Sequence, residues 1–284
     1  MKTKKIGLVG IYFPGAYDAL HENVPEGFEL VDALSPEAYG NLADCEYLIS
    51  RLDIDPDIIN HTPNVKFWQR WGAGFDHVDL KAWGERGIPI ATCPGVNSGI
   101  VAELAIMLML AGYRNLLQIN RQLRAGHWPR TEYFGRSFMI KGKTVGVLGL
   151  GHIGKKVAAL ASAFGANVIY YDIVRQPEQE EQFGYRFVDF DTLLKESDIF
   201  TIHCPLNEET RGMIGAAQFA KMKPTAMLIN TARGPIVDEA ALVDALTTGK
   251  IATAGLDTYE HEPLPKDHPL LTLDNVVASA HAGG

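Results

Sequence analysis

The sequence predicts an α/β protein built from two doubly wound parallel sheets. Short β-branched or apolar runs alternate with helical patterns along all 284 residues. Such strand-helix-strand alternation is typical of parallel sheets joined by right-handed crossovers. The chain also exceeds the roughly 250 residues beyond which a single hydrophobic core stops growing, so two domains are expected.

Eleven runs are candidate strands, and they fit two sheets better than one. The runs occupy residues 5–10, 28–34, 47–50, 66–71, 88–92, 143–150, 167–172, 199–203, 226–230, 251–257 and 276–281. Met227, Leu228 and Ile229 are apolar at consecutive positions, as expected for a strand covered on both faces.

The boundary between the domains is predicted where Gly and Pro cluster, at residues 94–99. We expect a first domain over residues 1–98 and a second over residues 99–282. Residues 283–284 would begin a return crossing to the first domain, and the natural chain is expected to continue beyond them. Segment 94–99 could serve as a hinge.

A single long helix is predicted from Ile100 to Leu123. Its sequence is apolar nearly all round, and such a helix needs cover on every side. A domain or subunit interface would supply that cover, so we expect a homodimer built partly on this helix.

The composition excludes several classes of partner. A formal net charge of -8 argues against nucleic acid or an anionic membrane as the main partner. No apolar run is long enough to span a bilayer, and no signal-peptide cleavage pattern follows the basic start. We therefore expect a cytoplasmic protein.

The cysteines and common motifs indicate no metal or nucleophile site. Cys45, Cys93 and Cys204 lie far apart, without disulfide or zinc spacing. The sequence has no H-E-x-x-H, no Walker A loop and no G-x-S-x-G elbow. We predict three buried free thiols and no metal.

Polar residues end several of the later candidate strands. Asp172, His203, Asp257 and His281 each close a run, and Arg233 follows another by three residues. The carboxyl ends of parallel strands form the ligand-binding edge of an open α/β sheet. These side chains are therefore candidates for one site.

The segment Gly149-Leu-Gly-His-Ile-Gly154 matches the dinucleotide fingerprint of a Rossmann domain. A strand run precedes it and a helical pattern follows it, ending near Gly165. The first glycine allows the tight turn, Gly151 allows close approach of the pyrophosphate, and the third allows helix and strand to pack. The free N–H groups of the helix N-terminus favour an anion there.

An acidic residue on the next strand favours NAD. Asp172 comes 18 residues after Gly154, where a carboxylate can accept hydrogen bonds from the ribose hydroxyls and repel a 2′-phosphate. Arg175 keeps NADP open as the alternative.

With these motifs in place, the chain resembles the D-2-hydroxyacid dehydrogenases, a family of NAD-dependent enzymes. The matching segments are Gly72–Asp79, Val101–Glu103, Gly149–Gly154, His203–Leu206, Asn230–Gly234, Asp257–Pro263 and Ser279–Gly284. The resemblance implies a flavodoxin-like substrate-binding (catalytic) domain, a Rossmann NAD-binding domain, and a cleft between them.

The resemblance also implies interconversion of a small 2-keto acid and its D-2-hydroxy acid. His281 would be the acid/base at the C2 oxygen, since an imidazole titrates near neutral pH. Glu262 would bond the other ring nitrogen and orient the ring. Arg233 would bind the substrate carboxylate and polarise the C2 oxygen. The N–H groups of Ala73 and Gly74 could hold the carboxylate.

The cofactor contacts expected from the resemblance surround the glycine loop. Asp257 would accept from the nicotinamide carboxamide. The complete set of expected contacts is Val101, Gly149, Gly151, His152, Ile153, Gly154, Asp172, His203, Cys204, Pro205, Thr231, Ala232, Arg233, Asp257 and His281.

Several candidates also have a structural interpretation. His203 could be a strand-end residue that never touches NAD. Glu262 could be a solvated charge in an acidic stretch, and the His152 side chain is expected to face solvent. Asp79 is predicted to cap the helix that follows it. Tyr12 and Phe13 could line the pocket, but we expect both to pack.

Two other functions stay open. Some relatives are NAD(H)-sensing corepressors, so a non-catalytic scaffold is one alternative, although no long disordered extension supports it. A formate or phosphite dehydrogenase of the same fold is the other.

Overall fold

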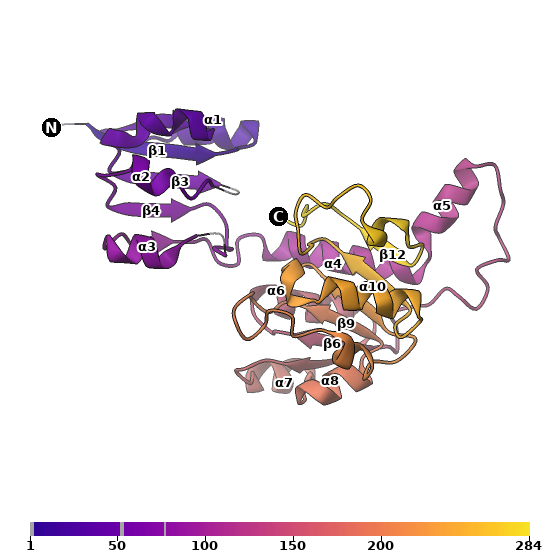
Figure 1. Ribbon diagram of the computed structural model, residues 1–284. Helices are drawn as coiled ribbons and strands as arrows, with labels where there is room; N and C mark the ends of the chain where they lie inside the picture. Colours follow the sequence, from indigo (N-terminus) through magenta and orange to yellow (C-terminus); the bar gives the residue numbers. More distant parts are fainter. Residues whose placement is uncertain (1–2, 52–53, 77) are drawn as a thin grey trace. The chain divides into compact units, whose positions relative to one another are not determined.

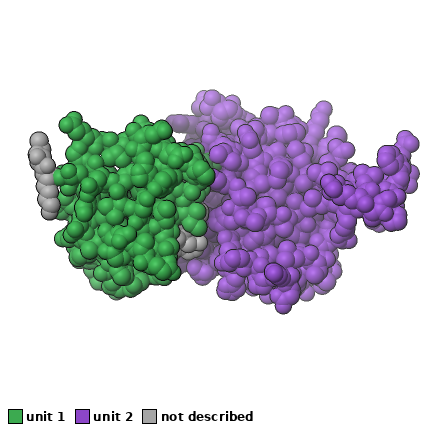
Figure 2. Space-filling view, turned by 90° about the horizontal axis from the view of Figure 1, so that it is seen from above, with its two compact units in different colours: residues 1–97 green, residues 98–284 purple. Residues whose placement is uncertain are grey.

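The computed structural model describes residues 3–51, 54–76 and 78–284 of the chain. It forms two compact units, residues 1–97 and residues 98–284 (Figure 2). Each unit is organised around its own parallel sheet. The division falls inside the predicted Pro- and Gly-rich segment 94–99.

The first unit contains a sheet in the order β2-β1-β3-β4-β5, with every described pair parallel. Its strands are β1 (Lys4–Gly10), β2 (Phe28–Ala33), β3 (Tyr47–Arg51), β4 (Phe67–Arg70) and β5 (Ile90–Ala91). Its helices are α1 (Pro14–Glu22), α2 (Ile58–His61), α3 (Leu80–Glu85) and the 3-10 helix η1 (Pro36–Asp44). Asp79 caps α3 as predicted, because its side chain accepts from Ala82 N at 2.9 Å.

The second unit contains a sheet in the order β12-β11-β10-β9-β6-β7-β8, again parallel throughout its described pairs. Its strands are β6 (Thr144–Leu148), β7 (Asn167–Tyr171), β8 (Arg186–Phe187), β9 (Ile199–Ile202), β10 (Met227–Asn230), β11 (Thr253–Leu256) and β12 (Val276–Ala278). Its helices are α4 (Ser98–Tyr113), α5 (Leu116–Arg124), α6 (His152–Ala163), α7 (Pro177–Phe183), α8 (Phe190–Glu196), α9 (Ala216–Phe219), α10 (Glu239–Thr247) and the 3-10 helices η2 (Gly234–Ile236) and η3 (Pro269–Thr272).

The order in which strands are added to the sheet reverses beside β6, and this reversal indicates where a ligand would bind. From β6 the chain adds β7 and β8 on one side, then crosses to add β9, β10, β11 and β12 on the other. Ligands of open α/β sheets bind outside the carboxyl ends at such a reversal. The loops after β6 and β9 are therefore the expected centre of a site.

The predicted α/β class with two parallel sheets is confirmed. Each of the eleven predicted runs contains a strand; nine strands are shorter than their runs, whereas β1 and β3 are one residue longer. Strand β8 was not predicted, because two residues carry too little pattern to be distinguished from a loop.

The single helix predicted from Ile100 to Leu123 is wrong. The structure has α4 and α5 there, bent by 62°. Asn115 lies at the break with φ 50°, in the left-handed region that Asn enters more readily than most residues. Its side-chain amide also donates to Arg136 O at 2.9 Å, which anchors the returning chain.

The apolar helix is covered only in part within its own unit. Helix α4 packs on α6, β10, β11 and β12, yet Ile100 and Met107 stay 59% and 52% exposed. Helix α5 buries none of its residues. Among the described residues, no single helix has the length and hydropathy of a membrane span, and α4 and α5 reach them only when counted together.

Candidate active site

The glycine loop joins β6 to α6 at the reversal point of the second sheet. Gly149 has φ 89°, and a Cβ there would lie 2.7 Å from Cys204 N. A Cβ on Gly154 would lie 2.0 Å from Gly149 O. Two of the three glycines are thus required by close backbone packing, because any side chain would collide with main-chain atoms.

Gly151 differs, and its surroundings fit a bound phosphate. A Cβ there would meet no heavy atom within 4 Å, so this position faces open space. It is the N-cap of α6, whose first-turn N–H groups have no acceptor inside the helix. Open space beside free N–H donors is the arrangement that a pyrophosphate requires. His152 is exposed, as predicted.

Asp172 directly follows β7 and is held at the mouth of this loop. Its Oδ2 accepts from Leu150 N at 2.6 Å, and its Oδ1 accepts from Val174 N at 3.2 Å. A carboxylate has about four acceptor sites, so each oxygen keeps capacity for a ribose hydroxyl. The geometry fits the predicted NAD contact.

His203 and Cys204 follow β9 beside the glycine loop. The imidazole Nε2 lies 2.8 Å from Thr201 Oγ1, while the buried Nδ1 has no partner among the described residues. Burial lowers the pKa of His203 to about 3 and raises the pKa of the Cys204 thiol to about 12. Burial thus favours the neutral imidazole of His203 and the neutral thiol of Cys204 near neutral pH. The predicted burial of the three thiols is confirmed for Cys45, whereas Cys93 and Cys204 are only partly buried.

Arg233 lies in a turn that Asn230 organises after β10. Asn230 Oδ1 accepts from Ala232 N at 3.0 Å, and its Nδ2 donates to Arg233 O at 2.9 Å. A Cβ on Gly234 would lie 1.9 Å from the Tyr259 carbonyl carbon. The turn carrying Arg233 therefore packs directly on the segment that leads to Glu262.

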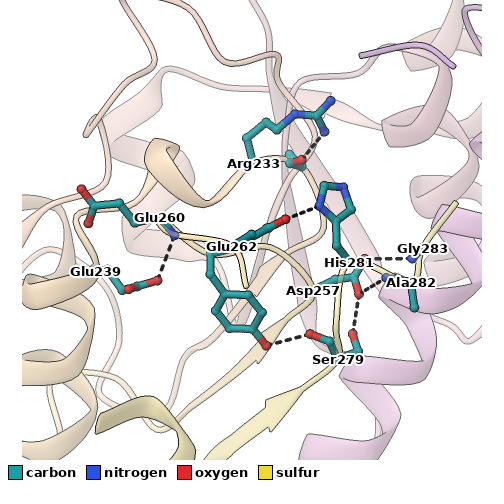
Figure 3. Close-up of polar contacts among 11 residues, drawn as sticks. Arg233, Glu239, Asp257, Glu260, Glu262, Ser279, His281, Ala282 and Gly283 are labelled. Atoms are coloured by element: carbon teal, nitrogen blue, oxygen red, sulfur yellow. Dashed lines mark hydrogen bonds and ion pairs between the residues drawn. The ribbon is translucent and has the colours of Figure 1, made fainter. Parts of the chain in front are cut away.

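Glu262 and His281 form the central contact of the site (Figure 3). His281 Nδ1 lies 2.6 Å from Glu262 Oε2, and Glu262 Oε1 accepts from Tyr259 N at 2.9 Å. The carboxylate thus binds Nδ1 and leaves Nε2 as the nitrogen available for exchange; this proton assignment follows from the acceptor beside Nδ1. Glu262 is therefore not the solvated charge that was considered as its alternative.

Asp257 holds the backbone around His281. Its buried carboxylate accepts from Ser279 Oγ at 2.6 Å, from Ala282 N at 2.9 Å and from Gly283 N at 2.9 Å. Its carbonyl oxygen accepts from His281 N at 2.8 Å. His281 itself has φ 50°, an unusual conformation for a residue with a side chain. Four hydrogen bonds to one residue stabilise that conformation.

This use of Asp257 was not predicted. The carboxylate was expected to bind the nicotinamide amide, whereas three of its roughly four acceptor sites are already used by the chain. One remaining acceptor site is compatible with the cofactor contact, which stays a prediction. The spacing of Ser279, Ala282 and Gly283 gives no pattern from which their shared partner could be found.

The other predicted cofactor contacts lie at or near this edge. Pro205 continues the segment after β9, and Thr231 Oγ1 is buried with no partner among the described residues. Val101 is 5% exposed on α4. A Cβ on Gly283 would lie 3.6 Å from Val101 Cγ2, so this valine faces the segment that follows His281. Ile153 is partly buried in the first turn of α6.

The first unit positions Ala73 and Gly74 in the loop after β4. Arg70 Nε donates to Gly74 O at 2.5 Å, and Cys93 N donates to Gly72 O at 2.9 Å. The N–H groups of Ala73 and Gly74 have no acceptor in the described part of the chain. They are available to bind a carboxylate, and that role stays a prediction.

Aromatic side chains gather at the same edge of the first sheet. Tyr12 packs as expected: its hydroxyl donates to Ile49 O at 2.8 Å, and its ring meets Trp71 edge-on. Phe13 does not pack into the core as expected: its side chain is 52% exposed, and the Arg51 guanidinium lies 4.9 Å from its ring centroid. In the described ranges, no group of three or more His, Cys, Asp or Glu residues could hold a metal ion.

Residues 106–283 match the family described as D-isomer specific 2-hydroxyacid dehydrogenase, NAD binding domain. A D-3-phosphoglycerate dehydrogenase of Archaeoglobus fulgidus is 46% identical over 82% of this chain and 44% of its own length. A glyoxylate reductase of Thermofilum pendens is 43% identical over 86% of this chain and 74% of its own. An NAD-dependent formate dehydrogenase of Staphylococcus aureus, solved with NAD, superposes with a TM-score of 0.86 at 30% identity, covering 99% of this chain and 89% of that one.

Proposed function

The chain belongs to the D-isomer specific 2-hydroxyacid dehydrogenase family, and from this premise we propose that it interconverts a small 2-keto acid and the D-2-hydroxy acid with NAD as cofactor. The aligned segment spans less than half of one relative and about three quarters of another. The reaction of the whole protein is therefore our proposal.

One observation carries it: Glu262 Oε2 binds His281 Nδ1 at 2.6 Å, and the turn that carries Arg233 packs on the segment leading to Glu262. Three residue types with complementary chemistry come from three separate segments and gather at one sheet edge. A scaffold that only senses NAD has no need of an imidazole held by a carboxylate. The contact therefore favours catalysis over the non-catalytic alternative.

Each side chain would have a definite task. NAD(H), when bound, accepts or supplies the hydride at C2 of the substrate. His281 Nε2 donates a proton to the C2 oxygen during reduction and removes it during oxidation. Glu262 stabilises the protonated ring and fixes its orientation. Arg233 binds the substrate carboxylate with its planar donors and polarises the C2 oxygen.

The direct test is His281→Ala, assayed as NADH oxidation with a panel of 2-keto acids. Loss of the acid/base should lower kcat by about 10²–10⁴-fold. His261→Ala is the matched control, because His261 is exposed and directly precedes Glu262. Equal turnover in both variants would refute the mechanism. Turnover of formate but no keto acid would favour the other dehydrogenase class.

We also propose that the protein is a homodimer. The partly uncovered face of α4 forms an apolar groove of about 590 Å³ lined by Met107, Leu110, Leu160 and Phe164. The loop at residues 125–139 extends with α5 away from the second sheet, and it exposes Trp128 to 80% (Figure 1). Exposed apolar surface of this kind typically marks an interface.

We propose that a second copy of the chain covers both the α4 groove and the extended segment of α5 and residues 125–139. A two-fold axis would let the extended segment of each copy fill the groove of the other. Light scattering should give twice the monomer mass, and Trp128→Lys should shift the protein toward monomer. A monomer at micromolar concentration in the unaltered chain would contradict the proposal. A cytoplasmic location belongs to the same proposal, because the enzyme needs the NAD pool of that compartment.

A further inference from the structure

The structure contains a contact at the adenosine edge that bears on cofactor choice. A residue just beyond the strand after the fingerprint helix faces the adenosine ribose: a carboxylate there accepts the hydroxyls, and a nearby arginine accommodates a 2′-phosphate. This chain carries one residue of each kind, Asp172 and Arg175, just after β7. Their presence in sequence alone leaves the choice undecided.

The arginine is already engaged. Arg175 Nε donates to Glu180 Oε1 at 2.8 Å, and Nη2 donates to Glu180 Oε2 at 2.8 Å. Two parallel charge-assisted bonds are the strongest arrangement of this pair of groups. The guanidinium carbon also lies 5.5 Å from the ring centroid of Phe187, which fixes its plane further.

The acid is the anchored member of this pair. Glu180 Oε1 also accepts from the Tyr170 hydroxyl at 2.8 Å, and that hydroxyl accepts from Gln176 N at 2.8 Å. Tyr170 is completely buried, whereas the Glu180 and Arg175 side chains are 19% and 61% exposed. The core of the unit therefore sets where Glu180 lies, and Arg175 follows it.

We propose that Glu180 determines the preference of this chain for NAD over NADP by keeping Arg175 in a closed ion pair. A 2′-phosphate could recruit the guanidinium only by breaking both bonds to Glu180. That exchange would leave the Glu180 carboxylate held at Tyr170 without its cation, and it would place the phosphate beside the Asp172 carboxylate. Asp172 repels the phosphate, and Glu180 withholds the Arg175 guanidinium that could compensate.

This inference rests on dinucleotide binding by the second unit and is independent of the substrate. The test measures dissociation constants of NADH and NADPH, and of ADP and 2′,5′-ADP, by calorimetry on the full chain. Glu180→Gln removes the charge that holds Arg175. We expect NADPH and 2′,5′-ADP to bind about tenfold more tightly, as one charge-assisted bond to phosphate would give. NADH and ADP should change by less than about twofold.

Two variants show whether the gain passes through Arg175. Glu178→Gln is the matched control: it removes the same charge from the same helix, but Glu178 is exposed and no contact with Arg175 is present. It should give little of the gain. Arg175→Ala placed in Glu180→Gln should abolish the gain. An equal gain in Glu178→Gln, or a gain that survives loss of Arg175, would overturn the proposal.

Arg175→Ala alone tests the proposal without altering Glu180. NADPH affinity should stay within about twofold, because the guanidinium is already neutralised. A marked loss of NADPH affinity would show that Arg175 reaches the phosphate and would refute the inference. If the unaltered chain binds no NADH, the proposed function fails together with this inference. If it binds NADH but Glu180→Gln leaves NADPH affinity unchanged, only this inference fails.

Discussion

Two acid–cation pairs lie in segments that follow strands of the same sheet, and they use a carboxylate for opposite purposes. Glu262 holds the imidazole of His281 at 2.6 Å, and Glu180 holds the guanidinium of Arg175 through two bonds of 2.8 Å. An imidazole gains and loses a proton near neutral pH, whereas a guanidinium stays protonated. The first pair is suited to proton transfer and the second to holding a fixed charge.

The two pairs also differ in how far they are exposed to solvent. The Glu262 and His281 side chains are 34% and 45% exposed, which leaves the ring accessible to a substrate. Glu180 is 19% exposed and held by a buried tyrosine. In the first pair the cation is positioned by its own backbone, and in the second it is positioned by its acid. The role of a carboxylate paired with a cationic side chain therefore depends on which of the two groups the fold holds in place.

The largest effect is expected from Glu262→Gln, which preserves shape but removes the charge from the first pair. The protonated ring loses its stabilising partner, so kcat should fall by about 10²-fold while KM for the keto acid changes much less. Glu260→Gln, two residues earlier on an exposed side chain, is the control. Equal kcat in both variants would contradict a role of Glu262 in proton transfer by His281, since Glu262 would then be no more than a surface charge.

A smaller effect on turnover, with a clear effect on stability, is expected from Asp257→Asn. The amide would present a donor to at least one of the N–H groups at Ala282 and Gly283, leaving a buried donor unsatisfied at a cost of about 1–3 kcal/mol. Urea unfolding and kcat measure both consequences. The exposed Asp267→Asn is the control. Unchanged stability would mean that the backbone at His281 needs no such support.

The second pair should respond more weakly to loss of its anchor. Tyr170→Phe removes the hydroxyl that bonds Glu180 and Gln176 N, and it should cost about 0.5–1.5 kcal/mol of unfolding free energy. Its NADPH affinity should rise less than in Glu180→Gln, because Arg175 keeps its partner. The neighbouring Tyr171→Phe is the control, since the Tyr171 hydroxyl makes no hydrogen bond among the described residues. A larger gain in NADPH affinity for Tyr170→Phe than for Glu180→Gln would contradict the claim that Glu180 holds Arg175 directly.

The smallest effect concerns acid. The bonds from Arg175, assisted by the Tyr170 hydroxyl, lower the pKa of Glu180 from its ordinary value of 4.5 to about 2. A lowered carboxyl pKa stabilises the fold above pH 4.5, and that contribution disappears as the pH falls toward 2. The difference in Tm between the unaltered chain and Glu180→Gln should therefore be small, constant above pH 4.5, and closing below it. A Tm difference that grows below pH 4.5 would contradict the ion pair between Glu180 and Arg175.

Much of the site could be predicted because its signals are local. The strand, glycine loop and helix at residues 143–165 are contiguous, and Asp172 follows within one strand. The alternation of strands and helices predicts parallel sheets without knowledge of any contact. The break of the long helix at Asn115 was not predictable, because the left-handed conformation of Asn115 is stabilised by a hydrogen bond to Arg136 O in the returning segment.

The α/β class, the parallel sheets, the dinucleotide loop and the family could all be predicted from the order of residues along the chain. Each depends on periodicity or on residues that are close along the chain. Three contacts become visible only in the folded chain: Glu262 with His281, Asp257 with the loop around His281, and Glu180 with Arg175. The first two contacts join segments at least 19 residues apart, which approach one another only after the strands have paired to bury the whole sheet. Glu180 and Arg175 are only five residues apart, but the Tyr170 hydroxyl that holds Glu180 is fixed only when its strand is buried in that sheet.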